Sequence, residues 1–422
     1  MTGSRAAAMW AGAAAAAAPL ARLWLARRAA SGKEIQARLP ERFGMETMAR
    51  PAGRVLWLHA ASVGEAVSVL PVLAELPAEL FTVFTTGTVT SARLLAQRLP
   101  EMGLSARVVH RFVPLDVPQW GARFLDHWRP EVACFLESEL WPNLIAGCQA
   151  RGVRLALLNA RLSVRSAARW ANVPGFARAV IGAFDWIEAQ TDGDARRLRS
   201  LGGRDVRYSG NLKFAAGVLP VAAGELARLQ AFLGARPRWV AASTHPGDEA
   251  LVAAVHAALA ARFDGLVTAI VPRHPERGAA ISAALGGVAR RGLGEDPPAD
   301  AGLWLVDTLG ELGLVYRLFD TVFMGKSFGA GGGQNPLEPA RLGCAVASGP
   351  AVGNFADVVA VLRAAGGLDV VADAAALTDW VAARLRDPDG RAAMGGRAAA
   401  AARAADALPE MLAARLVALM DR

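Results

Sequence analysis

The stretch that decides the fold is Leu58-His-Ala-Ala-Ser-Val-Gly-Glu65. The apolar run Val55–Leu58 has the pattern of a buried strand, and the segment Ala66–Leu73 has the pattern of a helix. Open α/β sheets bind ligands at turns of this kind, where the carboxyl end of a strand leads into a helix. The turn therefore predicts a ligand site as well as a fold.

Glu65 can have either of two roles in this turn. Ser62 can cap the helix with Glu65 three positions further along, which is the spacing of a capping box. Alternatively, the Glu65 carboxylate faces a ligand and acts as a catalytic base. From the spacing alone, the structural cap is the favoured interpretation.

Strand-like runs alternate with helical segments beyond the N-terminus. The first series comprises Val55–His59, Phe81–Thr85, Val132–Leu136, Leu155–Asn159 and Trp186–Ala189. The second comprises Trp239–Ser243, Leu266–Val271, Leu303–Asp307, Thr321–Met324 and Cys344–Ser348. Such alternation is typical of parallel sheets that are covered by helices on both faces. We therefore predict an α/β protein with two Rossmann-like, doubly wound domains facing a cleft.

The chain divides into five predicted segments. Residues 1–30 form a membrane anchor and residues 31–205 a first Rossmann-like domain. Residues 206–238 form an interdomain connection, residues 239–390 a second Rossmann-like domain, and residues 391–422 a helical tail.

The predicted anchor is an alanine-rich apolar stretch, Ala6–Leu25, which is interrupted by Arg22. A membrane span needs about 20 apolar residues, and this stretch barely reaches that length. Arg27, Arg28 and further basic residues follow it. We expect an anchor that spans the membrane or lies on it, with the positive flank in the cytoplasm. A cleaved signal peptide and a soluble helix are the alternatives.

The overall charge indicates an anionic partner. Lysine and arginine outnumber aspartate and glutamate by 46 to 38, and the formal charge is +8. The sequence contains no block of five or six basic residues, so nucleic acid is not the expected partner. Cys134, Cys148 and Cys344 lack the spacing of a zinc site and are odd in number, which fits a reducing compartment.

The first domain has a second carboxylate motif, Glu137-Ser-Glu-Leu-Trp-Pro142, directly after a predicted strand. Paired carboxylates can divide proton transfer and electrostatic stabilisation between them. The alternative is that Glu137 and Glu139 pair with nearby arginines. His59 and His110 are further candidate bases, although a lone histidine after a strand more often forms packing hydrogen bonds.

The second domain has three motifs that suit a nucleotide. Arg273 lies in Val271-Pro-Arg-His-Pro-Glu-Arg277, and a guanidinium matches phosphate geometry. Gly310 lies in the turn 307–312 and permits close approach of a ligand. The glycine-rich segment 324–338 then offers Asn335 as a helix cap, Pro336 as the first helical residue and Glu338 as a partner for ribose hydroxyls. This segment matches neither a P-loop nor a first-strand dinucleotide motif.

Together these residues resemble the 3-deoxy-D-manno-octulosonic acid (Kdo) transferase family, which is specific for lipid A precursor and depends on CMP-Kdo. The resemblance runs from about residue 20 to about residue 400. Its motifs are Ala60–Glu65, Pro114–Asp116, Glu137–Pro142, Asn159–Ser163, Gly210–Phe214, Pro272–Arg277, Asp307–Leu312 and Gly333–Glu338. It implies a GT-B glycosyltransferase fold, no metal and no other cofactor, and a place on the cytoplasmic face of the bacterial inner membrane.

The resemblance also implies residue roles. Glu65 matches the proton acceptor, and Glu137 and Lys213 match positions that stabilise the transition state. The CMP site would comprise Pro272, Arg273, Leu309, Gly310, Glu311, Asn335, Pro336, Leu337 and Glu338. Ser62, Arg161 and Arg165 are candidate acceptor-binding residues, with an ordinary surface role equally open for the two arginines.

Two positions depart from the family pattern. Leu309 stands where methionine is expected, which is tolerable if the backbone reads the base. Gln334 stands where histidine is common, and it lacks a titratable side chain, so proton transfer is not expected there.

The predicted activity is inverting transfer of Kdo from CMP-Kdo to lipid A precursor (lipid IVA) in lipopolysaccharide core biosynthesis, with Glu65 as general base. The expected partners are CMP-Kdo, the lipid precursor and an anionic membrane surface. The alternatives are a glycosyltransferase of the same fold that uses another nucleotide sugar, and a non-catalytic membrane-associated binding protein.

Overall fold

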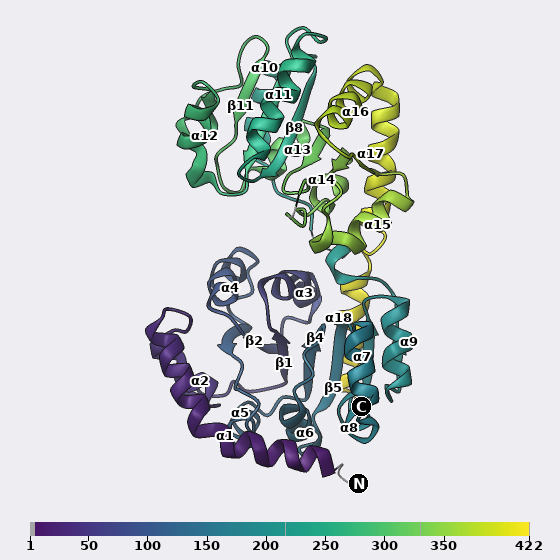
Figure 1. Ribbon diagram of the computed structural model, residues 1–422. Helices are drawn as coiled ribbons and strands as arrows, with labels where there is room; N and C mark the ends of the chain where they lie inside the picture. Colours follow the sequence, from purple (N-terminus) through teal and green to yellow (C-terminus); the bar gives the residue numbers. More distant parts are fainter. Residues whose placement is uncertain (1–4, 216, 330, 422) are drawn as a thin grey trace. The chain divides into compact units, whose positions relative to one another are not determined.

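The computed structural model describes residues 5–215, 217–329 and 331–421 in two compact units (Figure 1). Unit 1 comprises Met1–Ala216 and Ala405–Arg422, and unit 2 comprises Gly217–Ala404. Positions 1–4, 216, 330 and 422 belong to the predicted anchor, connection, second domain and tail, and they lie outside the described residues.

Unit 1 is built on a seven-stranded parallel sheet with the strand order β3-β2-β1-β4-β5-β6-β7. Its strands are β1 (Val55–Ala60), β2 (Phe81–Thr86), β3 (Val108–Phe112), β4 (Val132–Leu136), β5 (Arg154–Ala160), β6 (Trp186–Ala189) and β7 (Val206–Arg207). The central strands are almost continuously buried, because helices cover both faces of the sheet. The strand order reverses between β1 and β4, which is the topological switch point of the sheet.

The helices of unit 1 cover both faces of its sheet. They are α1 (Arg5–Ala30), α2 (Leu39–Arg42), α3 (Val63–Glu75), α4 (Val89–Glu101), α5 (Pro118–Trp128), α6 (Pro142–Ala150), α7 (Val164–Ala171), α8 (Pro174–Ile181), α9 (Asp192–Ser200) and α18 (Leu408–Met420), with 3₁₀ turns η1 (Gln36–Arg38) and η2 (Leu212–Ala215). Figure 1 shows α3 and α4 on one face of the sheet and α5 and α6 on the other. The sheet and these helices enclose a core that includes Trp57, Trp128 and Phe135.

Unit 2 has a second seven-stranded parallel sheet, with the order β10-β11-β9-β8-β12-β13-β14. Its strands are β8 (Arg238–Thr244), β9 (Val267–Pro272), β10 (Ala289–Arg290), β11 (Gly302–Leu305), β12 (Thr321–Met324), β13 (Ala345–Ser348) and β14 (Leu368–Val370). Its helices are α10 (Ala223–Leu233), α11 (Asp248–Ala260), α12 (Gly278–Ala284), α13 (Leu312–Leu318), α14 (Leu337–Arg341), α15 (Ala356–Ala364), α16 (Ala374–Arg386) and α17 (Pro388–Arg403), with 3₁₀ turns η3 (Pro275–Arg277), η4 (Arg291–Leu293) and η5 (Gly353–Phe355). The switch point lies between β8 and β12.

The predicted fold class is confirmed, and the ten predicted strands lie within two residues of the observed bounds. Four strands escaped prediction: β3, β7, β10 and β14. Each lies at a sheet edge, where one side of the strand has no neighbour. Strand β3 carries His110 and Arg111, and the other three have only two or three residues, so none has a long apolar run.

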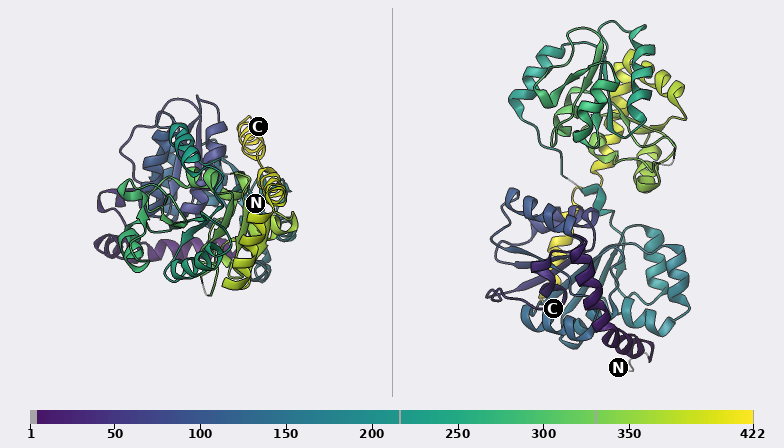
Figure 2. Two further views of the ribbon diagram at one scale, coloured as in Figure 1. Left: turned by 90° about the horizontal axis from the view of Figure 1, so that it is seen from above. Right: turned by 60° about the vertical axis from the view of Figure 1, so that its left-hand side comes forward.

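The unit boundaries differ from the predicted segments at two places. The predicted connection 206–238 is divided, since residues up to 216 belong to unit 1 and those from 217 to unit 2. The predicted tail 391–422 is divided as well, because α17 packs on β13 whereas α18 returns to unit 1 and packs on α3. Figure 2 shows the yellow C-terminal helix within unit 1. Its Arg415 forms an ion pair with Asp205, and Asp421 forms one with Arg54.

Helix α1 is the single described helix that is long and apolar enough to cross a membrane, by length and composition alone. It packs on α5, α6 and α8. Leu25 is buried, and the Trp10 indole donates a hydrogen bond to Asp116 at 3.1 Å. Apolar side chains such as Met9, Leu20 and Trp24 remain exposed. This helix is therefore docked on unit 1 along one side and open along the other.

Candidate active site

Glu65 is held at the carboxyl end of β1 by the first turn of α3. Ser62 is the N-cap, and its hydroxyl accepts a bond from the Glu65 backbone N–H at 3.3 Å and donates one to the Glu65 carboxylate at 2.8 Å. The Ala61 N–H donates to the other carboxylate oxygen at 2.8 Å. The predicted cap is thus confirmed, and it fixes the carboxylate in one orientation.

The surroundings of Glu65 raise the pKa of its carboxyl group. Burial is the main cause, because it penalises the charged form, and the nearby Glu139 and Glu137 carboxylates act in the same direction. The hydrogen bonds from Ala61 and Ser62 oppose this rise. A carboxylate with a raised pKa is a better proton acceptor than an ordinary surface glutamate.

The Glu137 motif lies at the end of β4, beside β1 at the switch point. The Glu137 carboxylate forms an ion pair with Lys213 at 3.1 Å. Glu139 accepts hydrogen bonds from the Trp141 indole at 2.7 Å, and its carboxylate lies 3.3 Å from His59 Nε2. The alternative in which both carboxylates pair with arginines therefore does not describe the motif.

Lys213 reaches Glu137 from the 3₁₀ turn η2, which is tied to β5. The Asn159 side-chain oxygen accepts a bond from the Leu212 N–H at 3.1 Å, and the Asn211 side-chain oxygen accepts one from the Lys213 N–H at 2.9 Å. The turn thus brings a residue far away in sequence to the end of β4. The structure places Glu65 and Glu137 at one edge of one sheet, as the sequence predicted, and brings Lys213 there from the predicted connection.

The candidate acceptor arginines are both exposed. Arg161 follows β5, and its backbone N–H donates to the Glu137 carbonyl oxygen at 3.2 Å. Arg165 lies in the first turn of α7. Neither side chain has an ion-pair partner among the described residues.

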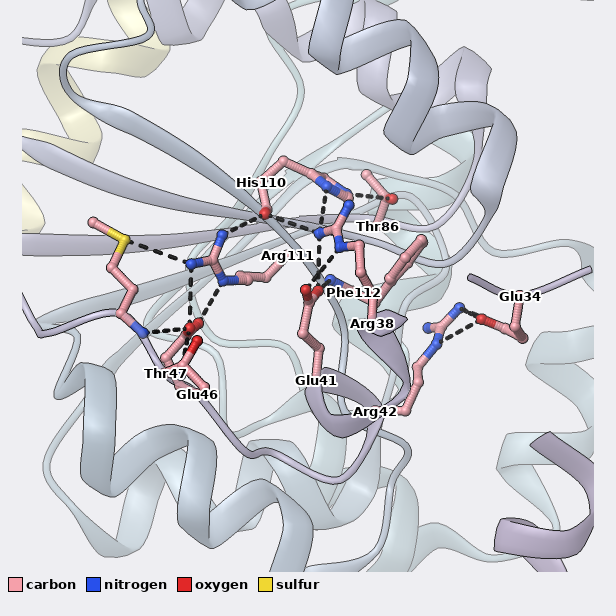
Figure 3. Close-up of polar contacts among 11 residues, drawn as sticks. Glu34, Arg38, Glu41, Arg42, Glu46, Thr47, Thr86, His110, Arg111 and Phe112 are labelled. Carbon is pink, nitrogen blue, oxygen red and sulfur yellow. Dashed lines mark hydrogen bonds and ion pairs between the residues drawn. The ribbon is translucent and has the colours of Figure 1, made fainter. Parts of the chain in front are cut away.

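The two histidines of unit 1 are packed into hydrogen-bond networks. His59 Nδ1 lies 3.0 Å from the Thr85 hydroxyl and its Nε2 faces Glu139. His110 bonds the Thr86 hydroxyl at 2.9 Å and lies 3.0 Å from an Arg38 nitrogen (Figure 3). Burial and the neighbouring arginines lower the pKa of His110 to about 3, so it is neutral at pH 7.

In unit 2, Arg273 and Glu338 approach one another from different elements. Arg273 follows β9 and is exposed, and its backbone N–H donates to the Thr244 carbonyl oxygen at 3.0 Å. Burial raises the pKa of Glu338, while a hydrogen bond from Asn335 and the charge of Arg273 oppose that rise. This corner therefore combines an exposed guanidinium with a carboxyl group that binds its proton more tightly than usual.

The predicted cap at Asn335 differs in detail. The helix α14 begins at Leu337 rather than at Pro336, and its N-cap residue is Pro336. The Asn335 side-chain oxygen accepts the Leu337 N–H at 3.1 Å, so it closes a turn before the helix. Its amide nitrogen donates to Glu338 at 3.3 Å, which links the two predicted residues.

The turn 309–311 is exposed at one end and anchored at the other. Leu309 is 83% exposed and Gly310 has a φ of 83°, a conformation that favours glycine. The Glu311 carboxylate accepts two bonds from Arg291, at 2.8 and 3.1 Å, and these bonds are the main cause of its lowered pKa. Glu311 therefore anchors the turn, while Leu309 and Gly310 are open to a ligand.

Sequence reasoning passed over the end of β8. His245 follows this strand, its ring nitrogen lies 3.1 Å from the Gln334 amide nitrogen, and its ring meets His274 at 5.7 Å. The Asp248 carboxylate accepts bonds from the backbone N–H groups of His245 and Lys326 at 2.9 and 2.7 Å. The available signal was the position of His245, directly after the first strand of the second series.

Backbone strain marks the same strand ends in both units. Among the described non-glycine residues, five have positive φ: Arg129, Glu137, Asn159, Ser243 and Lys326. All except Arg129 lie at or just beyond the carboxyl ends of β4, β5, β8 and β12. Residues in such sparsely populated conformations concentrate at functional sites.

Known proteins are similar to this sequence over most of its length. Residues 37–216 match the family described as 3-Deoxy-D-manno-octulosonic-acid transferase (kdotransferase). A probable mitochondrial 3-deoxy-D-manno-octulosonic acid transferase of Arabidopsis thaliana is 34% identical over 83% of this chain and 81% of its own length. The 3-deoxy-D-manno-octulosonic acid transferase of Bordetella pertussis is 33% identical over 89% of this chain and 91% of its own length. The chain belongs to the Kdo transferase family. This protein is therefore a Kdo transferase and a glycosyltransferase.

Solved structures agree on the fold of this Kdo transferase. A Rickettsia africae glycosyltransferase matches with a TM-score of 0.56 and 10% identity over 88% of this chain and 99% of its own. A Neisseria meningitidis UDP-GlcNAc 2-epimerase matches with a TM-score of 0.58 and 15% identity over 87% of this chain and 100% of its own. At such identities the likeness shows the fold alone, which is of the GT-B type.

Proposed function

We propose that this Kdo transferase moves Kdo from CMP-Kdo to a lipid A precursor, lipid IVA, with inversion at the anomeric carbon. The observation that supports this proposal is the carboxylate cluster at the switch point of unit 1. There a buried Glu65 with a raised pKa, oriented by Ser62 and Ala61, lies near the Glu137–Lys213 ion pair.

In the proposed reaction, the acceptor hydroxyl oxygen attacks the anomeric carbon of Kdo. The bond from that carbon to the phosphate oxygen of CMP breaks, and its electron pair leaves with CMP. The hydroxyl proton passes to the Glu65 carboxylate. One displacement of this kind inverts the anomeric centre and needs no covalent nucleophile on the protein.

Positive side chains would stabilise the charges that develop. CMP gains negative charge as it leaves, and the exposed Arg273 guanidinium suits a phosphate. The ion pair with Lys213 would hold the Glu137 carboxylate in place near the cationic sugar centre. With these groups supplying charge, we propose a reaction that needs neither metal nor other cofactor. Pro272, Leu309, Gly310, Asn335, Pro336, Leu337 and Glu338 would complete the CMP site, and Ser62, Arg161 and Arg165 the acceptor site.

We place the reaction on the cytoplasmic face of the bacterial inner membrane, within lipopolysaccharide core biosynthesis. The support is the lipid nature of the proposed acceptor together with α1, whose exposed side carries Met9, Leu20 and Trp24. Interfacial helices bury such side chains between lipid head groups. The net charge of +8 favours an anionic membrane surface.

The test is product analysis with the purified full chain, CMP-Kdo and a tetra-acylated acceptor, with and without a metal chelator. Mass spectrometry is expected to show the acceptor gaining Kdo at the same rate in both samples, and NMR to show inversion. Loss of transfer with the chelator would overturn metal independence. Consumption of UDP-GlcNAc in place of CMP-Kdo would favour a transferase of the same fold with another donor.

A further inference from the structure

An open groove of about 640 Å³ lies between α1 and α5 in unit 1. Two of the residues of α1 that line it, Ala15 and Ala18, are small and leave this space open. Pro19 also lines it and lacks the N–H that would bond the Ala15 carbonyl oxygen. Figure 1 shows α1 bending where it passes α5. The groove lies apart from every residue that the transfer reaction uses.

Two guanidinium groups line this groove, Arg22 from α1 and Arg123 from α5. Both side chains are exposed, and neither has a carboxylate partner among the described residues. The Arg22 guanidinium lies over the rings of Phe43 and Trp120, at 5.3 and 5.8 Å from their centroids. Contact with the rings covers a face of the guanidinium and leaves its in-plane N–H groups free to donate. Arg123 donates one long bond, of 3.5 Å, to the Phe43 carbonyl oxygen.

The other residues that line the groove are apolar, apart from Gln119. Leu23 lines it and is 61% exposed, and Leu20 beside it is 69% exposed. An exposed apolar strip next to two unpaired cations suits a ligand with an anionic head and a hydrocarbon tail. Because α1 has the length and composition of a membrane-associated helix, such a ligand is available at the bilayer surface.

We propose that this groove binds one anionic glycerophospholipid of the bilayer. Its phosphate would accept bonds from Arg22 and Arg123, and an acyl chain would lie along Ala15, Ala18 and Leu23. The lipid would contact both α1 and α5. It would thereby hold the docked helix α1 at a fixed position relative to the bilayer. This site is independent of the proposed transfer reaction, since none of its residues takes part in it.

The test compares full-length variants in detergent, with retained lipid measured by native mass spectrometry. The variant R22Q/R123Q removes both cations from the groove, and R93Q/R204Q removes two exposed arginines of unit 1 elsewhere. Phosphatidylglycerol is the probe, with phosphatidylcholine and glycerol phosphate as comparisons. We expect the wild type and R93Q/R204Q to retain one phosphatidylglycerol, and R22Q/R123Q to bind it about tenfold or more weakly.

A variant that fills the groove keeps the test independent of charge. Replacing Ala18 by leucine adds three carbon atoms to the groove without changing the charge, and it should also displace the lipid. Equal losses in the two double-arginine variants would overturn the proposal in favour of a general surface attraction. Unchanged binding in R22Q/R123Q or Ala18→Leu would overturn it too, as would equal retention of phosphatidylcholine. Binding of glycerol phosphate without the lipid would point to a free phosphate ligand instead.

Discussion

The two units share one strand arrangement but carry different side chains at the ends of their strands. In each sheet the first strand is central: β1 lies between β2 and β4 in unit 1, and β8 lies between β9 and β12 in unit 2, so β4 corresponds to β12. Each sheet adds one short edge strand, β7 in unit 1 and β10 in unit 2, but on opposite edges. Strand ends at or next to the switch point have positive φ in both units, at Glu137 and Asn159 in one and at Ser243 and Lys326 in the other.

The side chains at these ends differ in charge. Unit 1 gathers the carboxylates Glu65, Glu137 and Glu139. Unit 2 presents the exposed guanidinium of Arg273 and the ring of His245, together with Glu338, whose pKa is raised by burial. The comparison shows that the same topology can carry different side chains at its strand ends, mostly carboxylates in unit 1 and a guanidinium and an imidazole in unit 2.

The strongest test of this comparison is Glu65→Gln. The amide keeps the size of the side chain but cannot accept the proton, so kcat for Kdo transfer should fall by about 10²- to 10⁴-fold. Affinity for CMP should not change, because the proposed CMP residues lie in unit 2. Glu75→Gln, at the exposed far end of the same helix, is the matched control. Transfer at the wild-type rate by Glu65→Gln would remove Glu65 from the mechanism.

The complementary change in unit 2 is Arg273→Gln. A hydrogen bond from a charged group contributes about 1.5–3 kcal/mol, so the Kd of CMP should rise about tenfold to a hundredfold. Calorimetric titration with CMP measures this directly. Arg262→Gln, which removes a surface arginine paired with Asp379 at 3.8 Å, should leave the Kd unchanged. An unchanged Kd for Arg273→Gln would show that phosphate is held elsewhere.

Strands β3 and β11, which lie beyond β2 and β9 in the two sheets, should respond differently to acid. His110 on β3 has its pKa lowered to about 3 from an ordinary value of 6.5, whereas β11 carries no titratable side chain. Because the unfolded chain binds this proton more tightly, the stability that His110 contributes is present above pH 6.5 and is lost as the pH falls towards 3. Between pH 7 and pH 5 the loss should be about 2 kcal/mol.

Urea unfolding at the two pH values measures this loss, and His110→Gln should reduce it. Arg38, Glu41 and Arg111 surround the histidine, and they would remain in place in this variant (Figure 3). An equal acid loss in wild type and His110→Gln would assign the acid sensitivity to another group.

The smallest expected effect concerns the acid limb of the pH profile of the transfer rate. Ionised Glu139 contributes to the raised pKa of Glu65, so Glu139→Gln should move the acid limb of the kcat profile to lower pH. The amide can still face His59 and Trp141, which limits other changes. Exposed Glu101→Gln should leave the limb where it is. A limb that moves to higher pH would contradict the assignment.

Sequence patterns were sufficient for the buried framework of this protein. Runs such as Val132–Leu136 and Val322–Met324 are apolar throughout, because strands covered on both faces need no polar side chain. The Ser62–Glu65 cap was readable because it is local, with both partners in one turn. The edge strands β3 and β7 were not readable, since an edge strand needs only one neighbour and tolerates polar residues.

The sequence by itself determined the two parallel sheets, the family, and the strand ends that carry Glu65, Glu137 and Arg273. Only the tertiary structure decided which distant groups these side chains meet: Lys213 at Glu137, Asn335 at Glu338 and His59 at Glu139. It also returned α18 to the first unit and opened the groove between α1 and α5. The physical reason is the distance along the chain over which each effect acts. Periodicity and capping act within a few residues. Ion pairs, burial and the resulting pKa values depend on segments that only folding brings together.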